Sequence, residues 1–351
     1  MASCLAVVGC SLAFPTSDYR GTPASEASVE PGADAVAETS ELDAGACVVR
    51  KFPERPTGPR GGAREITLAF DALELGEQLE TLAFSRFDLD GVCTCPAASS
   101  CRPPPNERPP CDAPGGVDNA GGTWLAAADL LSGSGPTLSE RLRKGGSTLA
   151  LRIRGYNGER DDADVEATLF SLVSTPTYPR WDGNDVREPN ANGLASSEPL
   201  IGRLLDTQAF IRDDALVMTF SGIVPIGGIR VPFVDGRVVA KLGATGNATA
   251  IVEGHLTGRV PAAAILAAMA RLRDPQQGDA GFCASKNFAA AKDLLCRARD
   301  IHTDPNLDGR DTPCDALSVG ARFTAVAVAL SRAVATPPPA EFCASFTDDC
   351  P

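Results

Sequence analysis

Apolar and polar residues alternate over much of the span 64–260, and this period of two is typical of β-strands. In the clearest case, residues 147–174, an alternating run leads into Asn157-Gly158, a pair favoured in two-residue hairpin turns, and a second alternating run follows. The same pattern predicts two further hairpins, with bends at Asp213-Asp214 and at Asp235-Gly236. The middle of the chain is therefore predicted to form antiparallel strands.

The pattern changes after residue 260. Pro261 opens a stretch with apolar residues at helical spacing, which predicts a helix over about 261–273. A second run with helical spacing predicts another helix over about 285–300, and a β-branched run at 318–331 then returns as a strand. Strands, two helices and a closing strand together predict a mainly β domain, a β-sandwich-like fold with a two-helix insertion near the C-terminus.

The composition fits this mainly β prediction and limits the partners. Gly and Pro number 34 and 28 among 351 residues, while aromatic residues make up 5%, as expected for many turns and short strands. The net charge is −13, from 32 basic and 45 acidic residues, which argues against nucleic acid as a partner because phosphate binding needs a basic surface. No apolar run reaches the roughly 20 residues of a membrane-spanning helix.

The first residues carry a pattern of their own. Val7-Val8-Gly9-Cys10 resembles the lipobox of bacterial lipoproteins, in which small apolar residues precede a cysteine that is lipidated and becomes the new N-terminus after cleavage. The resemblance implies that residues 1–9 are the end of a truncated signal peptide, although the basic residues that such peptides carry are missing here. Residues 10–46 are small, acidic and poor in apolar side chains, which predicts a flexible tether. The alternative is a buried N-terminal strand with a free cysteine.

This layout implies an exported protein that is lipid-anchored in the outer membrane or periplasm. Residues 47–351 would then form one domain, which resembles the cysteine-rich surface type of bacterial lipoprotein. That type is uncharacterised and brings no established activity.

Cysteine counting supports the same compartment. Once Cys4 and Cys10 are set aside, an even number of cysteines remains, and in an exported chain this predicts five disulfides. The cysteines concerned are Cys47, Cys93, Cys95, Cys101, Cys111, Cys283, Cys296, Cys314, Cys343 and Cys350. They form two clusters of five, so complete pairing requires a bridge between the clusters and places both in one domain. The alternative is a zinc site within 93–101, but the Cys-x-Cys spacing there is closer than structural zinc ligands favour.

The stretch 304–315, DPNLDGRDTPCD, resembles the calcium loop of EF-hand proteins. Oxygen-bearing side chains alternate ahead of a sharp-turn glycine, as a calcium ion requires. The resemblance implies a structural Ca²⁺ ion held by Asp304, Asn306, Asp308, the backbone carbonyl of Arg310, and Asp315. It departs from the family at the last ligand, where a longer Glu is usual. The alternative is an acidic surface turn.

A weaker version of the calcium pattern occurs earlier in the chain. Asp88, Asp90 and Gly91 supply two donors and a glycine, with no further donor recognisable nearby. A turn that leads into Cys93 is the favoured interpretation of this stretch.

The loop-like stretch 178–190 places aromatic residues beside acidic ones. Aromatic faces with neighbouring hydrogen-bonding groups suit sugars, and loops on rigid sheets often carry binding sites. The stretch predicts a ligand-binding loop, with a glycan as one candidate ligand, formed by Tyr178, Trp181, Asp182 and Asp185. The alternative is that the aromatic side chains cover one end of the β domain.

Catalytic motifs are not recognisable in the sequence. The two histidines, His255 and His302, have no nucleophilic serine motif near them, and neither a zinc-protease nor a phosphate-loop motif occurs. The favoured prediction is a lipid-tethered cell-envelope protein with a structural, adhesive or ligand-binding role, and its partners would be the membrane, a glycan or another envelope protein. The alternative is an exported hydrolase that works with paired carboxylates.

Overall fold

The structure is a computed structural model in which the chain divides into two units, residues 1–44 and 45–351. All the residues that it describes belong to the second unit: 52–75, 87–94, 98–105, 107, 111–112, 116–122, 124, 137–191, 203–226, 229–274, 280–336, 343 and 350. The predicted lipidation site Cys10, the tether at 10–46, and both Cys47 and Cys95 lie outside the described residues.

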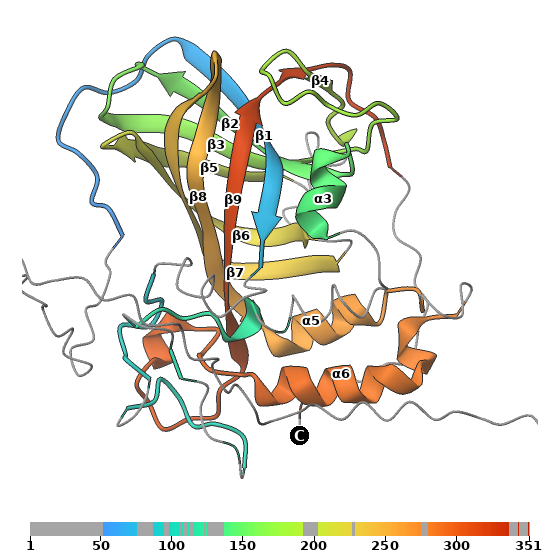
Figure 1. The fold of residues 1–351 in the computed structure, drawn as a ribbon. Coiled ribbons are helices and arrows are strands. Elements are labelled where there is room, and N and C mark those ends of the chain that lie inside the picture. The colour runs from blue at the N-terminus through green and yellow to red at the C-terminus, as the bar shows by residue number, and fades with distance from the viewer. Residues whose placement is uncertain are drawn as a thin grey trace, which may run out of the picture. The chain divides into compact units, whose positions relative to one another are not determined.

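Eight antiparallel strands form a closed barrel (Figure 1) in the order β1-β2-β3-β5-β6-β7-β8-β9. Their bounds are β1 Arg64–Glu74, β2 Thr148–Tyr156, β3 Asp162–Leu172, β5 Arg203–Arg212, β6 Ala215–Ile226, β7 Ile229–Thr245, β8 Ala248–Pro261 and β9 Ala316–Ala327. The mainly β prediction is confirmed, but the predicted sandwich is wrong. The last strand, β9, pairs with both β8 and β1, so the sheet closes on itself and has no free edges to form two layers.

The alternation that predicted strands also explains the packing. Side chains on one face of each strand, such as Phe70 on β1 and Leu151 on β2, belong to the large buried core. Side chains on the opposite face include Ala69 on β1 and Phe170 on β3, which belong to a second, smaller cluster. Each strand therefore buries side chains on one face in the large core, as the period of two requires.

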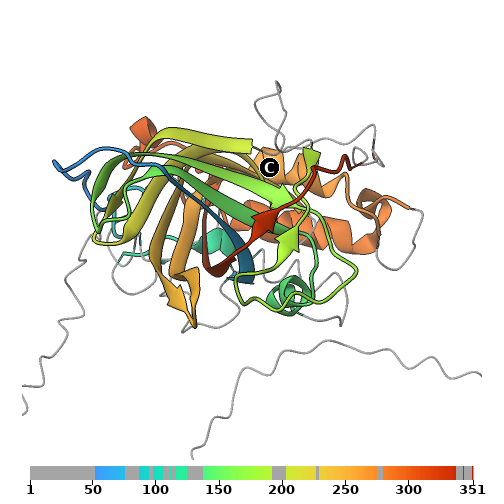
Figure 2. The ribbon, with the colours of Figure 1, turned by 90° about the horizontal axis from the view of Figure 1, so that it is seen from above.

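The small cluster is covered by a separate two-stranded sheet outside the barrel (Figure 2). β4 (Val186–Arg187) pairs in parallel with β10 (Ala329–Leu330), and Leu330 and Trp181 pack against the cluster. This cover explains why part of the outer barrel face is apolar.

The hairpin predictions have different outcomes. The hairpins at Asn157-Gly158 and Asp213-Asp214 are confirmed by the antiparallel pairs β2–β3 and β5–β6. The bend at Asp235-Gly236 is wrong, because β7 runs through it as one strand of 17 residues. Asp235 has a φ of 48°, and the register with β8 shifts between Val234 and Arg237, which identifies a β-bulge.

Both predicted helices are confirmed and are shorter than predicted: α5 spans Ala262–Met269 and α6 spans Lys286–Arg297. They lie below the barrel in Figure 1, where α5 packs on β7 and β8. A short helix that was not predicted, α3 (Leu138–Arg143), packs against β1. The structure also has two 3₁₀ turns, η1 (Phe282–Ala284) and η2 (Pro305–Leu307). None of the described helices is long and apolar enough to cross a membrane.

Disulfides brace the part of the chain around these helices. The bonds are Cys101–Cys314, Cys283–Cys343 and Cys296–Cys350, and Cys93 and Cys111 are also disulfide-bonded. The first joins residues 213 positions apart and connects the two cysteine clusters, as the odd number in each cluster required. The segment around residue 101 is thereby fixed beside the loop 304–315.

Candidate functional site

The predicted calcium loop, residues 304–315, uses its oxygen atoms within the protein. Asp304 caps the η2 turn, and its Oδ1 accepts hydrogen bonds from the backbone N–H of Asn306 (3.0 Å) and from its side-chain amide (2.8 Å). These hydrogen bonds hold the pKa of Asp304 below its ordinary value. Asp315 accepts a hydrogen bond from the Thr303 N–H (2.7 Å), and the carbonyl of Arg310 accepts one from Thr312.

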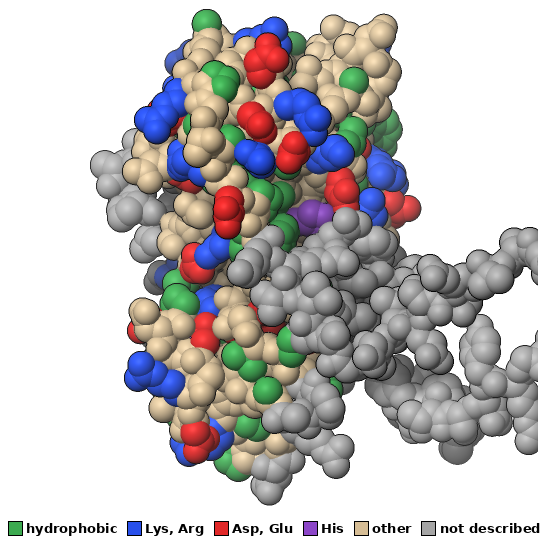
Figure 3. Space-filling model, turned by 90° about the vertical axis from the view of Figure 1, so that its left-hand side faces the viewer, with side chains coloured by type: hydrophobic (Ala, Val, Ile, Leu, Met, Phe, Trp, Pro, Cys, Tyr) green, Lys and Arg blue, Asp and Glu red, His purple; other side chains and the backbone are tan. Residues whose placement is uncertain are grey.

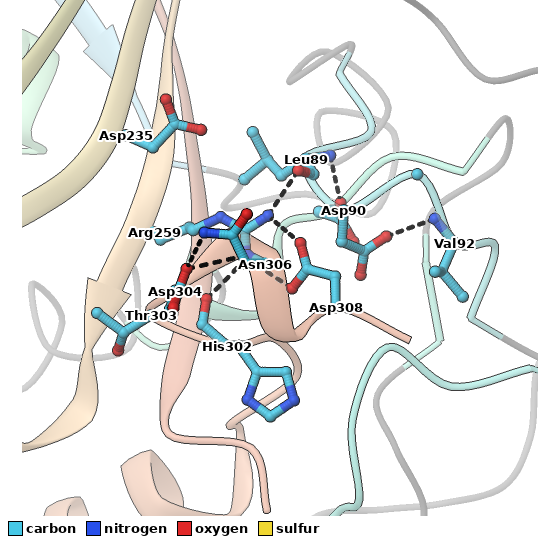
Figure 4. A network of polar contacts seen from close by, with 12 residues as sticks. Leu89, Asp90, Val92, Asp235, Arg259, His302, Thr303, Asp304, Asn306 and Asp308 are labelled. Atoms are coloured by element: carbon cyan, nitrogen blue, oxygen red, sulfur yellow. Dashed lines mark hydrogen bonds and ion pairs between the residues drawn. The ribbon is translucent and has the colours of Figure 1, made fainter. Parts of the chain in front are cut away.

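Asp308, the central predicted ligand, is bound by an arginine. Arg259 on β8 is fully buried, and its two terminal nitrogens donate to the two Asp308 carboxylate oxygens at 2.8 and 2.5 Å (Figure 4). The same guanidinium donates to the backbone carbonyls of His302 and Leu89, both at 2.7 Å. A cationic side chain thus satisfies the carboxylate for which the sequence predicted a calcium ion.

The acidic residues that the structure does bring together come from the weaker stretch. Asp88, Asp90 and Asp118 each offer a ligand oxygen, and these oxygens lie within 4.8 Å of one another. Among the described residues this is the one group of three or more acidic, histidine or cysteine side chains that are close enough to share a metal ion. We call it the acidic cluster.

Local backbone structure positions the first two members. Asp88 Oδ1 accepts hydrogen bonds from the N–H groups of Asp90 (3.1 Å) and Gly91 (2.6 Å), which folds the segment into a tight turn. Gly91 has a φ of +73°, a left-handed conformation that favours glycine. Asp90 in turn accepts a hydrogen bond from the Val92 N–H at 2.7 Å.

A distant segment supplies the third carboxylate. Asn119 accepts a hydrogen bond from the N–H of Gly320 on β9 (2.7 Å), which ties residues 116–122 to the barrel. Asp118 then accepts a hydrogen bond from the Leu89 N–H at 2.6 Å. The sequence analysis missed Asp118. This residue stands in a glycine-rich stretch, where no other acidic side chain follows at the spacing of a metal-binding loop.

The cluster concentrates negative charge in a buried place. Burial, together with the charges of Asp88 and Asp112, raises the pKa of Asp90 to about 7, although the Ser100 hydroxyl and the Val92 N–H act to lower it. Burial and the charges of Asp90, Asp300 and Asp112 hold the pKa of Asp118 well above its ordinary value. Burial also raises the pKa of Asp112 to about 6 and that of Asp300 to about 7.

The predicted aromatic loop is folded by its own acidic residues. Asp185 accepts hydrogen bonds from the N–H groups of Arg180 (3.0 Å) and Trp181 (2.6 Å), and Asp182 accepts one from Asn184 (3.0 Å). The Trp181 indole donates to the carbonyl of Arg143, and its ring faces the buried Arg187 guanidinium. Tyr178 is 76% exposed. Trp181 thus packs against the outer barrel cluster, as the structural alternative expects, and the ligand-binding role of the loop stays a prediction.

The histidines and the charged surface show no further grouping of this kind in the described part of the chain. His255 lies 3.3 Å from Glu253, and His302 lies 3.1 Å from the Thr312 hydroxyl. Acidic and basic side chains are interspersed over the upper half of the face shown in Figure 3. Comparisons of the chain with protein-family models, with curated protein sequences and with solved structures found no match.

Proposed function

We propose that this chain is an exported cell-envelope protein, lipid-tethered through Cys10, whose barrel domain has a non-enzymatic structural or adhesive role. The observation that carries the proposal is the Cys101–Cys314 disulfide, which is buried and joins the two cysteine clusters across 213 positions. Disulfides of this kind form and persist in oxidising compartments. Together with Cys283–Cys343 and Cys296–Cys350, this bridge supports export.

The packing of the barrel supports a structural role. Its core contains large side chains that are fully buried, among them Phe70, Phe233 and Phe323. A barrel filled by side chains is a rigid body, in contrast to barrels whose interior holds a ligand. A rigid body at the end of a long tether is suited to contacts with other envelope components.

The alternative, an exported hydrolase that uses paired carboxylates, finds its densest group of carboxylates in the acidic cluster. Asp88 and Asp118 are only 7% and 1% exposed, so a substrate would have to reach carboxylates that the protein covers. The structural or adhesive role is therefore the better supported proposal.

The test is the intact mass of the native protein from the membrane fraction of its host, before and after reduction. We expect a chain that starts at Cys10 with acyl groups, and a gain of about two daltons per disulfide on reduction. A Cys10→Ala variant, expressed in the same host, should leave the membrane fraction. A chain that keeps residues before Cys10, carries no acyl group and gains no mass on reduction would overturn the proposal.

A further inference from the structure

We propose that Asp88, Asp90 and Asp118 bind one divalent cation with the size and oxygen preference of Ca²⁺. This site differs from the loop 304–315 that the sequence favoured, and it does not depend on the proposed cellular role. Three observations carry the inference: the spacing of the oxygens, the unpartnered state of buried carboxylate atoms, and the way in which the backbone holds each carboxylate.

The spacing of the oxygens fits a calcium ion. Calcium–oxygen bonds are about 2.3–2.6 Å long, so two ligands on one ion are separated by at most about 5 Å. The ligand oxygens of the acidic cluster lie within 4.8 Å of one another. A single ion can therefore contact all three carboxylates with little movement of the chain. Magnesium, with bonds of about 2.0–2.1 Å, demands near-ideal octahedral geometry, whereas calcium accepts irregular arrangements of oxygens.

Each of the three carboxylates keeps one oxygen that lacks a hydrogen-bond partner. These atoms are Asp88 Oδ2, Asp90 Oδ2 and Asp118 Oδ1, and all three are buried. The Ser100 hydroxyl and the Asp112 carboxyl lie near enough to Asp90 and Asp118 to shift a pKa, but neither forms a hydrogen bond of standard geometry with these oxygens. Asp118 is 1% exposed and Asp88 is 7% exposed, so water does not freely solvate them. A buried carboxylate oxygen without a partner is costly, and such groups in native proteins are usually paired or bound to a metal ion.

No basic side chain relieves this charge in the described part of the chain. The buried Arg259 reaches the turn through the Leu89 carbonyl, and its guanidinium is committed to that carbonyl, to the His302 carbonyl and to Asp308. The remaining sources of positive charge are protons or a metal ion. The experiment below distinguishes these two.

Backbone amides hold the other oxygen of each carboxylate. The N–H groups of Asp90 and Gly91 bind Asp88, that of Val92 binds Asp90, and that of Leu89 binds Asp118. Leu89 also accepts a hydrogen bond from Arg259 through its carbonyl, which anchors the turn to β8 (Figure 4). The carboxylates are thus oriented before an ion arrives, as outer-shell contacts orient ligands in metal sites.

The donor type indicates a hard cation. All three side chains are carboxylates, and such oxygen ligands suit calcium, magnesium or manganese better than zinc or copper. The nearby Cys93 and Cys111 are disulfide-bonded and therefore offer no thiolate. Calcium is the member of the group that best tolerates the flexible coordination offered by three carboxylates from two separate segments.

The test uses the full chain with its disulfides intact, freed of metal by a chelator and then titrated with Ca²⁺ by calorimetry. The titration should extend to about 5 mM, above the roughly 0.1–1 mM dissociation constants of weak extracellular calcium modules. We expect one ion per chain and a higher melting temperature with Ca²⁺ than with chelator. Native mass spectrometry counts the bound ions independently.

Matched variants locate the ion. In Asp118→Asn the amide oxygen still accepts the Leu89 hydrogen bond, so a loss of affinity of about tenfold or more reports the lost anionic ligand. Asp90→Asn should lower the affinity in the same way. Near-ultraviolet circular dichroism checks that each variant folds, and Asp90→Asn replaces Asp118→Asn if the latter does not fold. Asp304→Asn, in the exposed loop that the sequence favoured, is the control and should bind as the unmodified chain does.

Two outcomes would overturn the inference. Binding that is lost in Asp304→Asn and kept in Asp118→Asn and Asp90→Asn would return the ion to the loop 304–315. The absence of any ion, with Ca²⁺ or Mg²⁺, would mean that the buried carboxylates are neutralised by protons alone.

Discussion

The buried ion pair between Arg259 and Asp308 offers the strongest test of how the lower end of the barrel is held together. Arg259 has a side chain that is 1% exposed, and Asp308 one that is 9% exposed. Replacing Asp308 with alanine removes both acceptors of the paired hydrogen bonds and leaves a buried guanidinium with only the carbonyls of His302 and Leu89. The uncompensated charge should destabilise the fold strongly.

The size of the effect follows from the burial of the pair. Breaking a buried ion pair by removing one partner costs about 3–5 kcal/mol, because the other charge stays buried. A change of 1 kcal/mol corresponds to roughly 2–4 °C in Tm for domains of about 150–250 residues and to the lower end of that range for a larger unit such as residues 45–351, so Asp308→Ala should melt about 6–10 °C lower. The double variant Arg259→Met with Asp308→Leu removes both charges and should lose less stability than Asp308→Ala alone.

The assay is urea unfolding with the disulfides intact and the calcium concentration fixed. The control is Asp213→Asn, which weakens the exposed pair between Arg160 and Asp213, whose side chains are 70% and 64% exposed. That change should cost less than about 1 kcal/mol, as exposed pairs usually do. The reasoning is wrong if Asp308→Ala costs no more than Asp213→Asn, or if the double variant is less stable than Asp308→Ala.

Three further predictions concern other parts of the fold. Replacing Cys101 and Cys314 by serine opens a loop of 213 positions and should lower the free energy of unfolding by roughly 5 kcal/mol on chain entropy, and an unchanged urea midpoint would contradict this. Burial raises the pKa of Asp300 to about 7 from an ordinary 3.8, so the folded state favours the protonated acid. The free energy of unfolding of the calcium-free protein should therefore fall as the pH rises from about 4 to about 7, and a higher urea midpoint at pH 8 than at pH 5 would disprove it. Trp181→Phe keeps an aromatic ring but loses the hydrogen bond to the Arg143 carbonyl, which should cost about 1 kcal/mol in the same assay, whereas a stability equal to that of the unmodified chain would place the indole outside that contact.

Local sequence patterns predicted the strands well, since alternation depends only on which side of a strand faces a core. They could not predict closure of the barrel, because β9 pairs with β1 across most of the chain length. The contrast between Asp213-Asp214 and Asp235-Gly236 shows the same limit. Asp213, Asp214 and Asp235 all adopt positive φ, at 51°, 64° and 48°. A residue with positive φ can stand in a hairpin turn or in a β-bulge. At Asp235 the strand β7 continues, because β6 and β8 pair with it on both sides.

The same reasoning explains why the sequence favoured the loop 304–315 as the place for an ion, whereas our proposal places it at the acidic cluster. The loop 304–315 has the spacing of a calcium loop, but spacing does not reveal that Arg259, 49 positions away, binds its central carboxylate. The stretch around Asp88 has fewer donors in sequence, yet folding brings Asp118 to it from 29 positions beyond Leu89. What separates the two stretches is whether the carboxylate oxygens already have partners, and only the tertiary structure contains that information. Our proposal therefore relies on buried oxygens without a partner and not on the spacing of acidic residues in the sequence.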